Sequence, residues 1–334
     1  MSLLSVRDLS VAFETGHGRL QAVNEVSLEV EAGETVGLVG ESGCGKSTLG
    51  KAIIRLVPIS GGRVFVDGKD ITDLKPRALK PLRAAIQMIF QDPYGSLNPR
   101  HTIGKIIGQP LVVAGASKSE VRDRVDALME KVGLPREVRS RFPHEFSGGQ
   151  RQRIGIARAL TLNPKIVICD EPVSALDVSV RAQVINLMRD LQQELGVAYL
   201  FISHDLSVVE HISDRLIVMY LGRVVEAGRS VDIWARPAHP YTQALLAAAP
   251  LADPKAARSR KRIVLYGEPP SPFDPPLGCA FNTRCPFAQD RCRSERPALR
   301  SIQDGRQLAC HFDLVDSTVE ASLVESGRAQ YITA

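Results

Sequence analysis

The most informative segment of this sequence reads Gly40-Glu41-Ser42-Gly43-Cys44-Gly45-Lys46-Ser47-Thr48. It fits the pattern G-x-x-x-x-G-K-S/T and follows an apolar run, Thr35 to Val39, that reads as a strand. Glycines allow consecutive backbone N–H groups to converge on phosphate oxygens, and a helix that begins after them adds the positive end of its dipole. We therefore expect a nucleotide-binding loop in which Lys46 bridges the β- and γ-phosphates and the Ser47 hydroxyl binds Mg²⁺.

A pair of carboxylates follows a second apolar strand. Ile166 to Cys169 reads as a strand buried on both faces, and Asp170 and Glu171 come directly after it. A carboxylate at a strand end can hold Mg²⁺ through water, and its neighbour can orient or deprotonate the attacking water. Charged residues also occur where a strand merely meets solvent. The phosphate-binding loop upstream favours the catalytic interpretation.

The pattern of apolar residues predicts an α/β fold. Three β-like runs separated by glycine-containing turns indicate an antiparallel N-terminal layer: Leu3 to Val11, Gln21 to Val30 and Arg63 to Val66. Strands and helices then alternate, which is typical of a parallel sheet covered by helices. Residues 93–160 read as an inserted helical lobe, in which Ser117 and Glu120 form a capping box.

Composition and charge exclude several classes of protein. Of the 334 residues, 44% are hydrophobic, and the net charge is +5. Basic and acidic residues are interspersed, so no nucleic-acid-binding stripe is visible, and the densest basic run, Lys255 to Arg262, reads as a solvated linker. No run approaches the roughly 18 apolar residues of a membrane-spanning helix, and the first residues lack the features of a secretory signal. We expect a cytosolic protein that reaches a membrane only through partners.

The character of the chain changes from His239 onwards. Prolines become frequent there, among them Pro250 and Pro254, and the apolar periodicity weakens, which predicts a linker and a small irregular unit. We place a boundary near Ala238, with one domain at residues 1–238 and a C-terminal extension at residues 239–334.

A second glycine-containing segment distinguishes among nucleotide-binding proteins. It reads Phe146-Ser147-Gly148-Gly149-Gln150 and continues Arg151-Gln152-Arg153. Ser147 and Gln150 form a capping box, so a helix would present its N-terminus to an anion. Capping alone does not explain the paired glycines, which weaken a helix start unless something approaches the backbone closely. The segment resembles the signature sequence of ABC ATPases, and the resemblance covers residues 3 to about 235.

The resemblance implies a set of ATP-binding and catalytic residues. Gln91 looks like the Q-loop residue that contacts Mg²⁺ and water and senses the transmembrane partner. Ser174-Ala175-Leu176-Asp177 resembles the D-loop that crosses the dimer interface, and His204 resembles the switch histidine near the γ-phosphate. Phe13 occupies the place of the aromatic residue that stacks on adenine, where the family more often has Tyr. All nine residues of the phosphate-binding loop would contact ATP.

The resemblance also implies partners. In ABC ATPases each ATP is held between the phosphate-binding loop of one subunit and the signature segment of the other, so Ser147, Gly148, Gly149 and Gln150 would serve the partner's nucleotide. Two membrane subunits would dock near Gln91 to Pro99.

The C-terminal part narrows the resemblance further. His239-Pro240-Tyr241-Thr242 and Gly267-Glu268-Pro269-Pro270-Ser271-Pro272 resemble the extension found in ATPases of dipeptide, oligopeptide and nickel importers. The match is best with the second ATPase of dipeptide permeases, which implies a second homologous ATPase, two permease subunits, an extracytoplasmic solute-binding protein, and a peripheral position on the cytoplasmic face of the inner membrane. Import of nickel or another small solute is the alternative. A soluble ABC ATPase acting on DNA or ribosomes would have a long coiled-coil insertion between the motifs or two cassettes in one chain, and an exporter would lack this extension.

Four of the six cysteines lie in the extension: Cys279, Cys285, Cys292 and Cys310. Their separations of five, six and seventeen residues exclude paired C-x-x-C zinc knuckles. Four thiolates in an irregular loop suit a 4Fe–4S cluster, which similar extensions carry, and a structural zinc site including His311 or four unconnected thiols are the alternatives. We expect a small extension held together by a metal.

Overall fold

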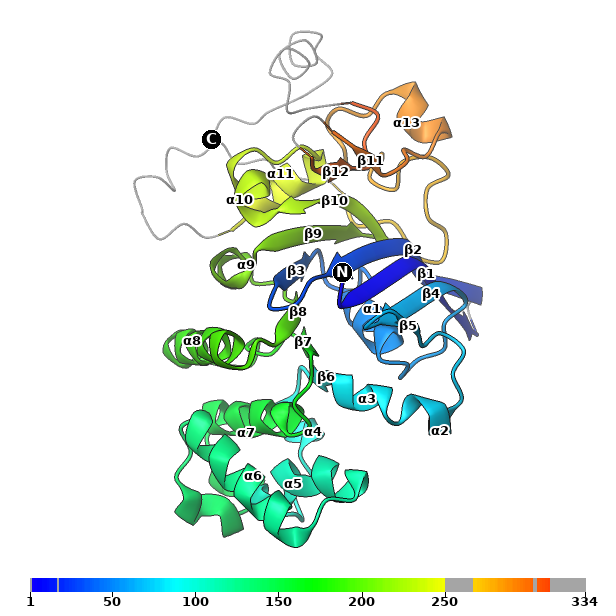
Figure 1. Ribbon diagram of the computed structural model, residues 1–334. Helices are drawn as coiled ribbons and strands as arrows, with labels where there is room; N and C mark the ends of the chain where they lie inside the picture. The colour runs from blue at the N-terminus through cyan, green and yellow to red at the C-terminus, as the bar shows by residue number, and fades with distance from the viewer. Residues whose placement is uncertain (1, 17, 250–266, 303–304, 313–334) are drawn as a thin grey trace.

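The computed structural model describes residues 2–16, 18–249, 267–302 and 305–312 (Figure 1). The predicted basic linker at Lys255 to Arg262, together with Pro250 and Pro254, lies outside these ranges.

The N-terminal layer is an antiparallel sheet, as predicted. It has the strand order β2-β1-β4-β5, and its members are β1 (Leu4–Thr15), β2 (Gly18–Val30), β4 (Gly61–Val66) and β5 (Lys69–Asp70). Inward-facing Val and Leu side chains of this sheet pack in one cluster with the helix α1 (Lys46–Ile53), which follows the phosphate-binding loop. The antiparallel sheet therefore covers one side of that loop.

The central sheet has the order β11-β12-β10-β9-β3-β8-β7-β6. Its parallel part consists of β3 (Thr35–Val39), β6 (Ile86–Ile89), β7 (Ile166–Asp170), β8 (Ala198–Ile202) and β9 (Arg215–Tyr220). The strand β10 (Arg223–Arg229) continues the sheet in the antiparallel direction. Because parallel strands end at the same edge, the loops after β3, β6, β7 and β8 meet there.

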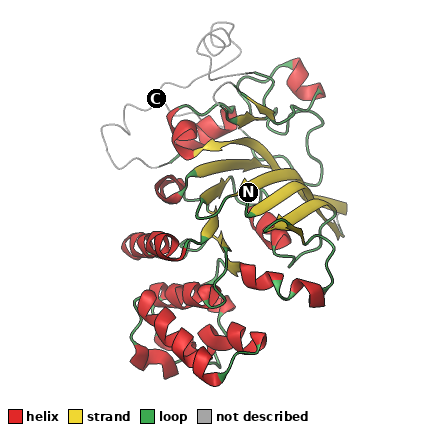
Figure 2. Ribbon diagram, viewed as in Figure 1, coloured by secondary structure: helices red, strands yellow, loops and turns green. Residues whose placement is uncertain are grey.

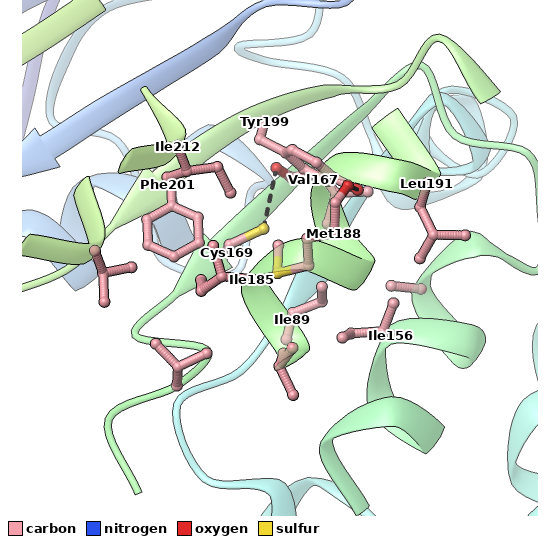
Figure 3. Close-up of a cluster of buried hydrophobic side chains, with 14 of the residues drawn as sticks. Ile89, Ile156, Val167, Cys169, Ile185, Met188, Leu191, Tyr199, Phe201 and Ile212 are labelled. Atoms are coloured by element: carbon pink, nitrogen blue, oxygen red, sulfur yellow. Dashed lines mark hydrogen bonds between the residues drawn. The ribbon is translucent and has the colours of Figure 1, made fainter. Parts of the chain in front are cut away.

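Helices and the antiparallel layer cover the two faces of the parallel strands (Figure 2). Val167 and Cys169 of β7 point into a core shared with α7, α8 (Val178–Leu195) and α9 (Leu206–Ile212), which Figure 3 shows in close-up. Ile166 and Ile168 point to the opposite core, which contains α1. Burial on both faces explains why the sequence of β7 is apolar throughout.

The helical lobe forms where it is predicted and lies at one end of the molecule (Figure 1). It follows the short helices α2 (Pro76–Leu79) and α3 (Leu82–Ala85) and comprises α4 (Pro93–Ser96), α5 (Ile103–Ala114), α6 (Lys118–Lys131), the 3₁₀ turns Arg136–Ser140 and Pro143–Glu145, and α7 (Gly148–Leu160). Ser117 and Glu120 make the predicted capping box at the start of α6.

The C-terminal part extends the central sheet. Its elements are α10 (Ser230–Ala235), α11 (Pro240–Ala247), α13 (Asp290–Ser294), β11 (Arg300–Ser301) and β12 (Gln307–Leu308), and β12 pairs with β10. A fully buried ion pair joins Arg306, beside β12, to Glu226 of β10 at 3.2 Å. Glu226 also accepts backbone N–H bonds from Ala238 and His239. The extension is thus held by strand pairing and a buried ion pair.

Within the ranges given above, every helix is too short or too polar to cross a membrane.

Candidate nucleotide-binding site

The phosphate-binding loop follows β3 in a conformation that requires glycine. Gly40 and Gly45 have φ angles of 152° and 102°. A Cβ atom would lie 2.2 Å from the carbonyl oxygen of Met219 at Gly40, and 2.1 Å from that of Ala22 at Gly45. The backbone of the loop therefore packs closely against β9 on one side and β2 on the other, and α1 begins immediately after the loop. This arrangement matches the predicted anion-binding loop.

Lys46 lies inside the loop. Its side chain is buried, and Nζ donates hydrogen bonds of 2.8 Å to the carbonyl oxygens of Gly40 and Glu41. The two carbonyl oxygens fix the position of the ammonium group within the loop. Cys44 is buried beside it, and burial raises the pKa of its thiol, so the thiol is neutral and carries no chemistry.

Ser47 and Asp170 form the oxygen pair that the sequence assigns to Mg²⁺. Ser47 Oγ donates to Asp170 Oδ1 at 2.6 Å, although the two residues are far apart in sequence. Burial raises the pKa of Asp170, and the bond from Ser47 and the charge of Lys51 lower it in part. A hydroxyl and a carboxylate oxygen are ligands that Mg²⁺ prefers, so the donor set fits this ion.

Gln91, Glu171 and His204 converge at the end of three neighbouring strands. Gln91 follows β6, Glu171 follows β7 and His204 follows β8. Gln91 Nε2 donates to Glu171 Oε2 at 2.8 Å, and His204 Nδ1 lies 3.1 Å from Glu171 Oε1. The backbone of Glu171 has a φ of 47°, and its N–H bonds to the carbonyl oxygen of Ile202. Backbone strain of this kind is common at functional sites.

A pocket of about 270 Å³ runs along the loop. Phe13 lines it together with Leu20 and Gln21, so the aromatic residue predicted to stack on adenine is in the pocket that contains Lys46. The lining also includes Ser42, Gly43, Gly45, Ser47, Thr48, Gln91 and Glu171. Sequence reasoning missed six lining residues: Leu20, Gln21 and Ala22 of β2, Leu221 and Gly222 in the turn after β9, and Pro272 in the proline-rich stretch.

The signature segment faces away from this pocket. Ser147 caps α7 and forms the predicted capping box with Gln150, and both side chains are exposed. Among the described residues that line the pocket, none belongs to Ser147–Gln150. Packing within the chain accounts for one of the two glycines, since a Cβ at Gly149 would lie 2.4 Å from Val180 Cγ1. Gly148 has no comparable restriction.

The predicted D-loop follows Glu171 directly. Ser174 Oγ donates to the carbonyl oxygen of Glu171 at 3.0 Å, which ties this loop to the backbone of Glu171. Leu176 is buried, whereas Ala175 and Asp177 are exposed. The exposed positions leave a surface that a second subunit can contact.

The described residues do not support the metal site expected at the four cysteines of the extension. Cys279 N–H bonds to the carbonyl oxygen of Cys292 at 2.8 Å. Burial raises the pKa of Cys285 and Cys310, the latter to about 12, and the neighbouring cysteines raise both further. Yet within residues 2–16, 18–249, 267–302 and 305–312 no three His, Cys, Asp or Glu side chains are arranged to hold a metal ion.

The expectation of a metal-stapled extension is therefore not supported. His311, the residue considered for zinc, bonds through Nε2 to the carbonyl oxygen of Glu295. Strand pairing and the Glu226–Arg306 pair supply the attachment that the sequence analysis assigned to a metal.

Comparisons with known proteins agree with the site geometry. A family model described as ABC transporter matches residues 23–174, and one described as oligopeptide/dipeptide transporter, C-terminal region, matches residues 225–292. The chain is 55% identical over 300 residues to a probable peptide ABC transporter ATP-binding protein of Sinorhizobium fredii, covering 90% of this chain and 84% of that protein. It is 54% identical to the oligopeptide transport ATP-binding protein OppF of Salmonella typhimurium, covering 89% and 92%.

Solved structures show the same core. The cbiO1 protein from Clostridium perfringens, part of the ABC transporter complex cbiONQ, aligns with a TM-score of 0.63 at 29% identity over 70% of this chain and 91% of that one. The ATP-binding cassette MJ0796, solved as a dimer in a post-hydrolysis state with ADP and phosphate, gives the same TM-score and identity over 68% and 98%.

Proposed function

The chain belongs to the family of ATP-binding proteins of peptide ABC transporters, and from this membership we propose that its ATP hydrolysis powers the import of peptides across the cytoplasmic membrane. The observation that supports hydrolysis most directly is the convergence of Gln91, Glu171 and His204 next to the Ser47–Asp170 pair. The match of residues 225–292 to the oligopeptide/dipeptide transporter region supports peptides as the cargo.

The residues of the site have separate tasks in the proposed reaction. Loop amides and Lys46 bind the phosphates, and Ser47 and Asp170 would hold Mg²⁺, which would supply positive charge to neutralise the phosphates. Glu171 accepts a hydrogen bond from the attacking water and orients its oxygen towards the γ-phosphorus. The water oxygen forms a bond to the γ-phosphorus while the bond from that phosphorus to the bridging oxygen breaks, and a proton of the water passes through Glu171 to the phosphate, which yields ADP and phosphate. Gln91 and His204 fix the two oxygens of Glu171.

We propose that a second, homologous ATPase subunit completes each ATP-binding site. The exposed Ser147 and the half-buried Gly148 lie at the N-terminus of α7, a helix end suited to binding an anion, and neither residue lines the nucleotide pocket of its own chain. The dimeric state of the related cassette MJ0796 supports this arrangement. Glu171→Gln should retain ATP and accumulate a closed dimer, which size-exclusion chromatography with ATP detects. Glu130→Gln, at an exposed surface ion pair, is the control.

We propose that two permease subunits dock beside the helical lobe, near Gln91 to Pro99, and that an extracytoplasmic binding protein delivers the solute to them. Tyr94 is 63% exposed in this segment, and the guanidinium of Arg151 lies 3.7 Å from the centre of its ring. An aromatic residue that is exposed yet held in place by a cation is suited to an interface. The chain would then lie on the cytoplasmic face of the membrane.

Reconstituted transport tests the function. The full assembly in sealed vesicles is supplied with a labelled peptide or with nickel, with ATP on the side of the ATPases. We expect ATP-dependent peptide uptake that Glu171→Gln abolishes and Glu130→Gln preserves. Uptake of nickel without peptide, or peptide uptake by the Glu171→Gln variant, would contradict the proposal.

The iron–sulfur cluster stays a prediction of the sequence, tested by iron and sulfide analysis after anaerobic purification. Four irons and four sulfides per chain would support it, and stoichiometric zinc without iron would end it.

A further inference from the structure

The C-terminal extension contacts Glu41 of the phosphate-binding loop. The two contacting residues, Tyr241 and Arg284, come 200 and 243 residues later in the sequence. We propose that Arg284 is a positioning residue for nucleotide binding, which acts by holding Glu41 and, through it, Lys46. The proposal rests on the function proposed above, since it assigns the extension a role in the ATP site itself. No motif of the sequence points to Arg284.

The Arg284–Glu41 contact is short and protected from water. Nη1 of Arg284 lies 3.0 Å and 2.9 Å from the two carboxylate oxygens of Glu41. The side chain of Arg284 is only 8% exposed and that of Glu41 28%. Hydrogen bonds between charged groups in such surroundings are strong and directional. Surface ion pairs elsewhere in the extension, such as Arg291–Glu295, are about 60% exposed on both sides and add little.

A second contact holds the backbone of the same residue. The N–H of Glu41 donates to the hydroxyl of Tyr241, in α11, at 2.8 Å. Tyr241 is fully buried and packs against Tyr220 and Phe281, with ring centres 4.7 Å and 5.5 Å away. Residues beyond the ATPase core therefore fix Glu41 at both its amide and its carboxylate.

Glu41 transmits this restraint to the phosphate site. Its carbonyl oxygen is one of the two oxygen acceptors of the Lys46 ammonium, which also donates to Cys44 Sγ at 3.7 Å. The other acceptor, Gly40, is already held by its close approach to Met219 of β9. If Glu41 moved, one carbonyl acceptor of Lys46 would shift while the carbonyl of Gly40 stayed in place. The ammonium group of Lys46 would therefore change its position. The extension also supplies Pro272 to the lining of the nucleotide pocket.

Packing alone does not explain why an arginine occupies position 284. Its Nε–H is buried and finds no acceptor among the described residues, which costs stability. An apolar side chain of similar size would avoid that cost but could not donate hydrogen bonds to the Glu41 carboxylate. The free-energy cost is therefore offset by the contact with the loop.

Titration calorimetry of the full-length chain with MgADP tests the inference. We expect Arg284→Ala to weaken MgADP binding by about three- to tenfold, because a charge-assisted contact one residue removed from the phosphates is lost. In the full assembly the KM for ATP should rise by a similar factor, while kcat at saturating ATP stays within about twofold. Arg284→Lys, which keeps the charge, should recover part of the affinity.

Matched variants separate positioning from stability. Arg291→Ala removes an exposed arginine–carboxylate pair that lies within the same extension, with Glu295 as the partner, and should leave affinity unchanged. Glu41→Gln weakens the contact from the loop side without altering the extension, and should lower affinity as Arg284→Ala does. The double variant should then be no weaker than either single variant, since both remove one interaction.

Three outcomes would overturn the inference: wild-type MgADP affinity in Arg284→Ala, equal losses in Arg291→Ala and Arg284→Ala, or additive losses in the double variant. Failure of the wild-type assembly to hydrolyse ATP would instead contradict the proposed function, and the binding measurement on the single chain is independent of that result.

Discussion

Replacing Gly149 with alanine tests whether a glycine of the signature segment is required by the fold or by the nucleotide. The new Cβ would lie 2.4 Å from Val180 Cγ1, at the start of α8. Ordinary carbon–carbon contacts are about 3.5–4.0 Å, so α7 and α8 must separate by roughly 1 Å or Val180 must leave its preferred rotamer. Overpacking of this kind costs about 1–3 kcal/mol. For a chain of 334 residues the melting temperature should fall by roughly 1–4 °C.

Two other glycines of α7 serve as controls. At Gly155 an added Cβ meets nothing within 4 Å, so alanine should stabilise the helix by about 0.5–1 kcal/mol. At Gly148 the nearest atom, Leu176 Cδ2, is at an ordinary 3.5 Å, so alanine should leave stability unchanged. Gly148→Ala should nevertheless reduce the ATPase activity of the assembly, because the helix end could no longer approach a nucleotide closely.

Thermal unfolding followed by circular dichroism, together with steady-state ATPase rates, measures both effects. Wild-type stability in Gly149→Ala would refute the packing account. Full ATPase activity in Gly148→Ala would refute the role of this helix end in binding the partner's nucleotide.

Three further predictions concern other parts of the chain. Burial raises the pKa of Asp170 above its unfolded value of 3.8, so its contribution to stability is present below that pH and is lost as pH rises. Without nucleotide, Asp170→Asn should therefore be more stable than wild type near pH 7. The difference in unfolding free energy, measured by urea titration, should shrink towards about pH 4. A difference that does not change with pH would contradict the burial effect. Arg306→Ala leaves Glu226 buried and unpaired, so it should cost about 3–5 kcal/mol and expose the chain beyond Ala238 to limited proteolysis. Unchanged proteolysis would show that the pair does not hold the extension. Phe13→Ala should weaken MgADP binding measured by calorimetry by about tenfold, whereas Phe13→Tyr should not; equal affinities would remove Phe13 from the adenine site.

The sequence was sufficient for features that depend on neighbouring residues. The glycines of residues 40–48 specify a loop that few other residue types can form, and the structure shows that loop between β3 and α1. The apolar run before Asp170 predicts a doubly covered strand, and β7 is buried on both faces. The capping box at Ser117 likewise marks the start of α6. In each case the physical requirement is local, so the residues that meet it are adjacent or one helical turn apart.

The extension was predicted less well. Its proline-rich sequence gave no sign that β12 would pair with β10, since two-residue strands have no measurable periodicity. The cysteine spacings favoured a metal site, but spacing does not fix where side chains point, and the described residues contain no such arrangement.

The sequence by itself determined which chemistry this protein carries: a phosphate-binding loop, a carboxylate pair and a capped helix end. Only the tertiary structure decided which distant residues act together. Gln91, Glu171 and His204 meet because the sheet order places β6, β7 and β8 side by side, and Arg284 reaches Glu41 across 243 residues because the extension continues the same sheet. Such contacts depend on how the whole chain packs, so they cannot be predicted from any short segment of the sequence.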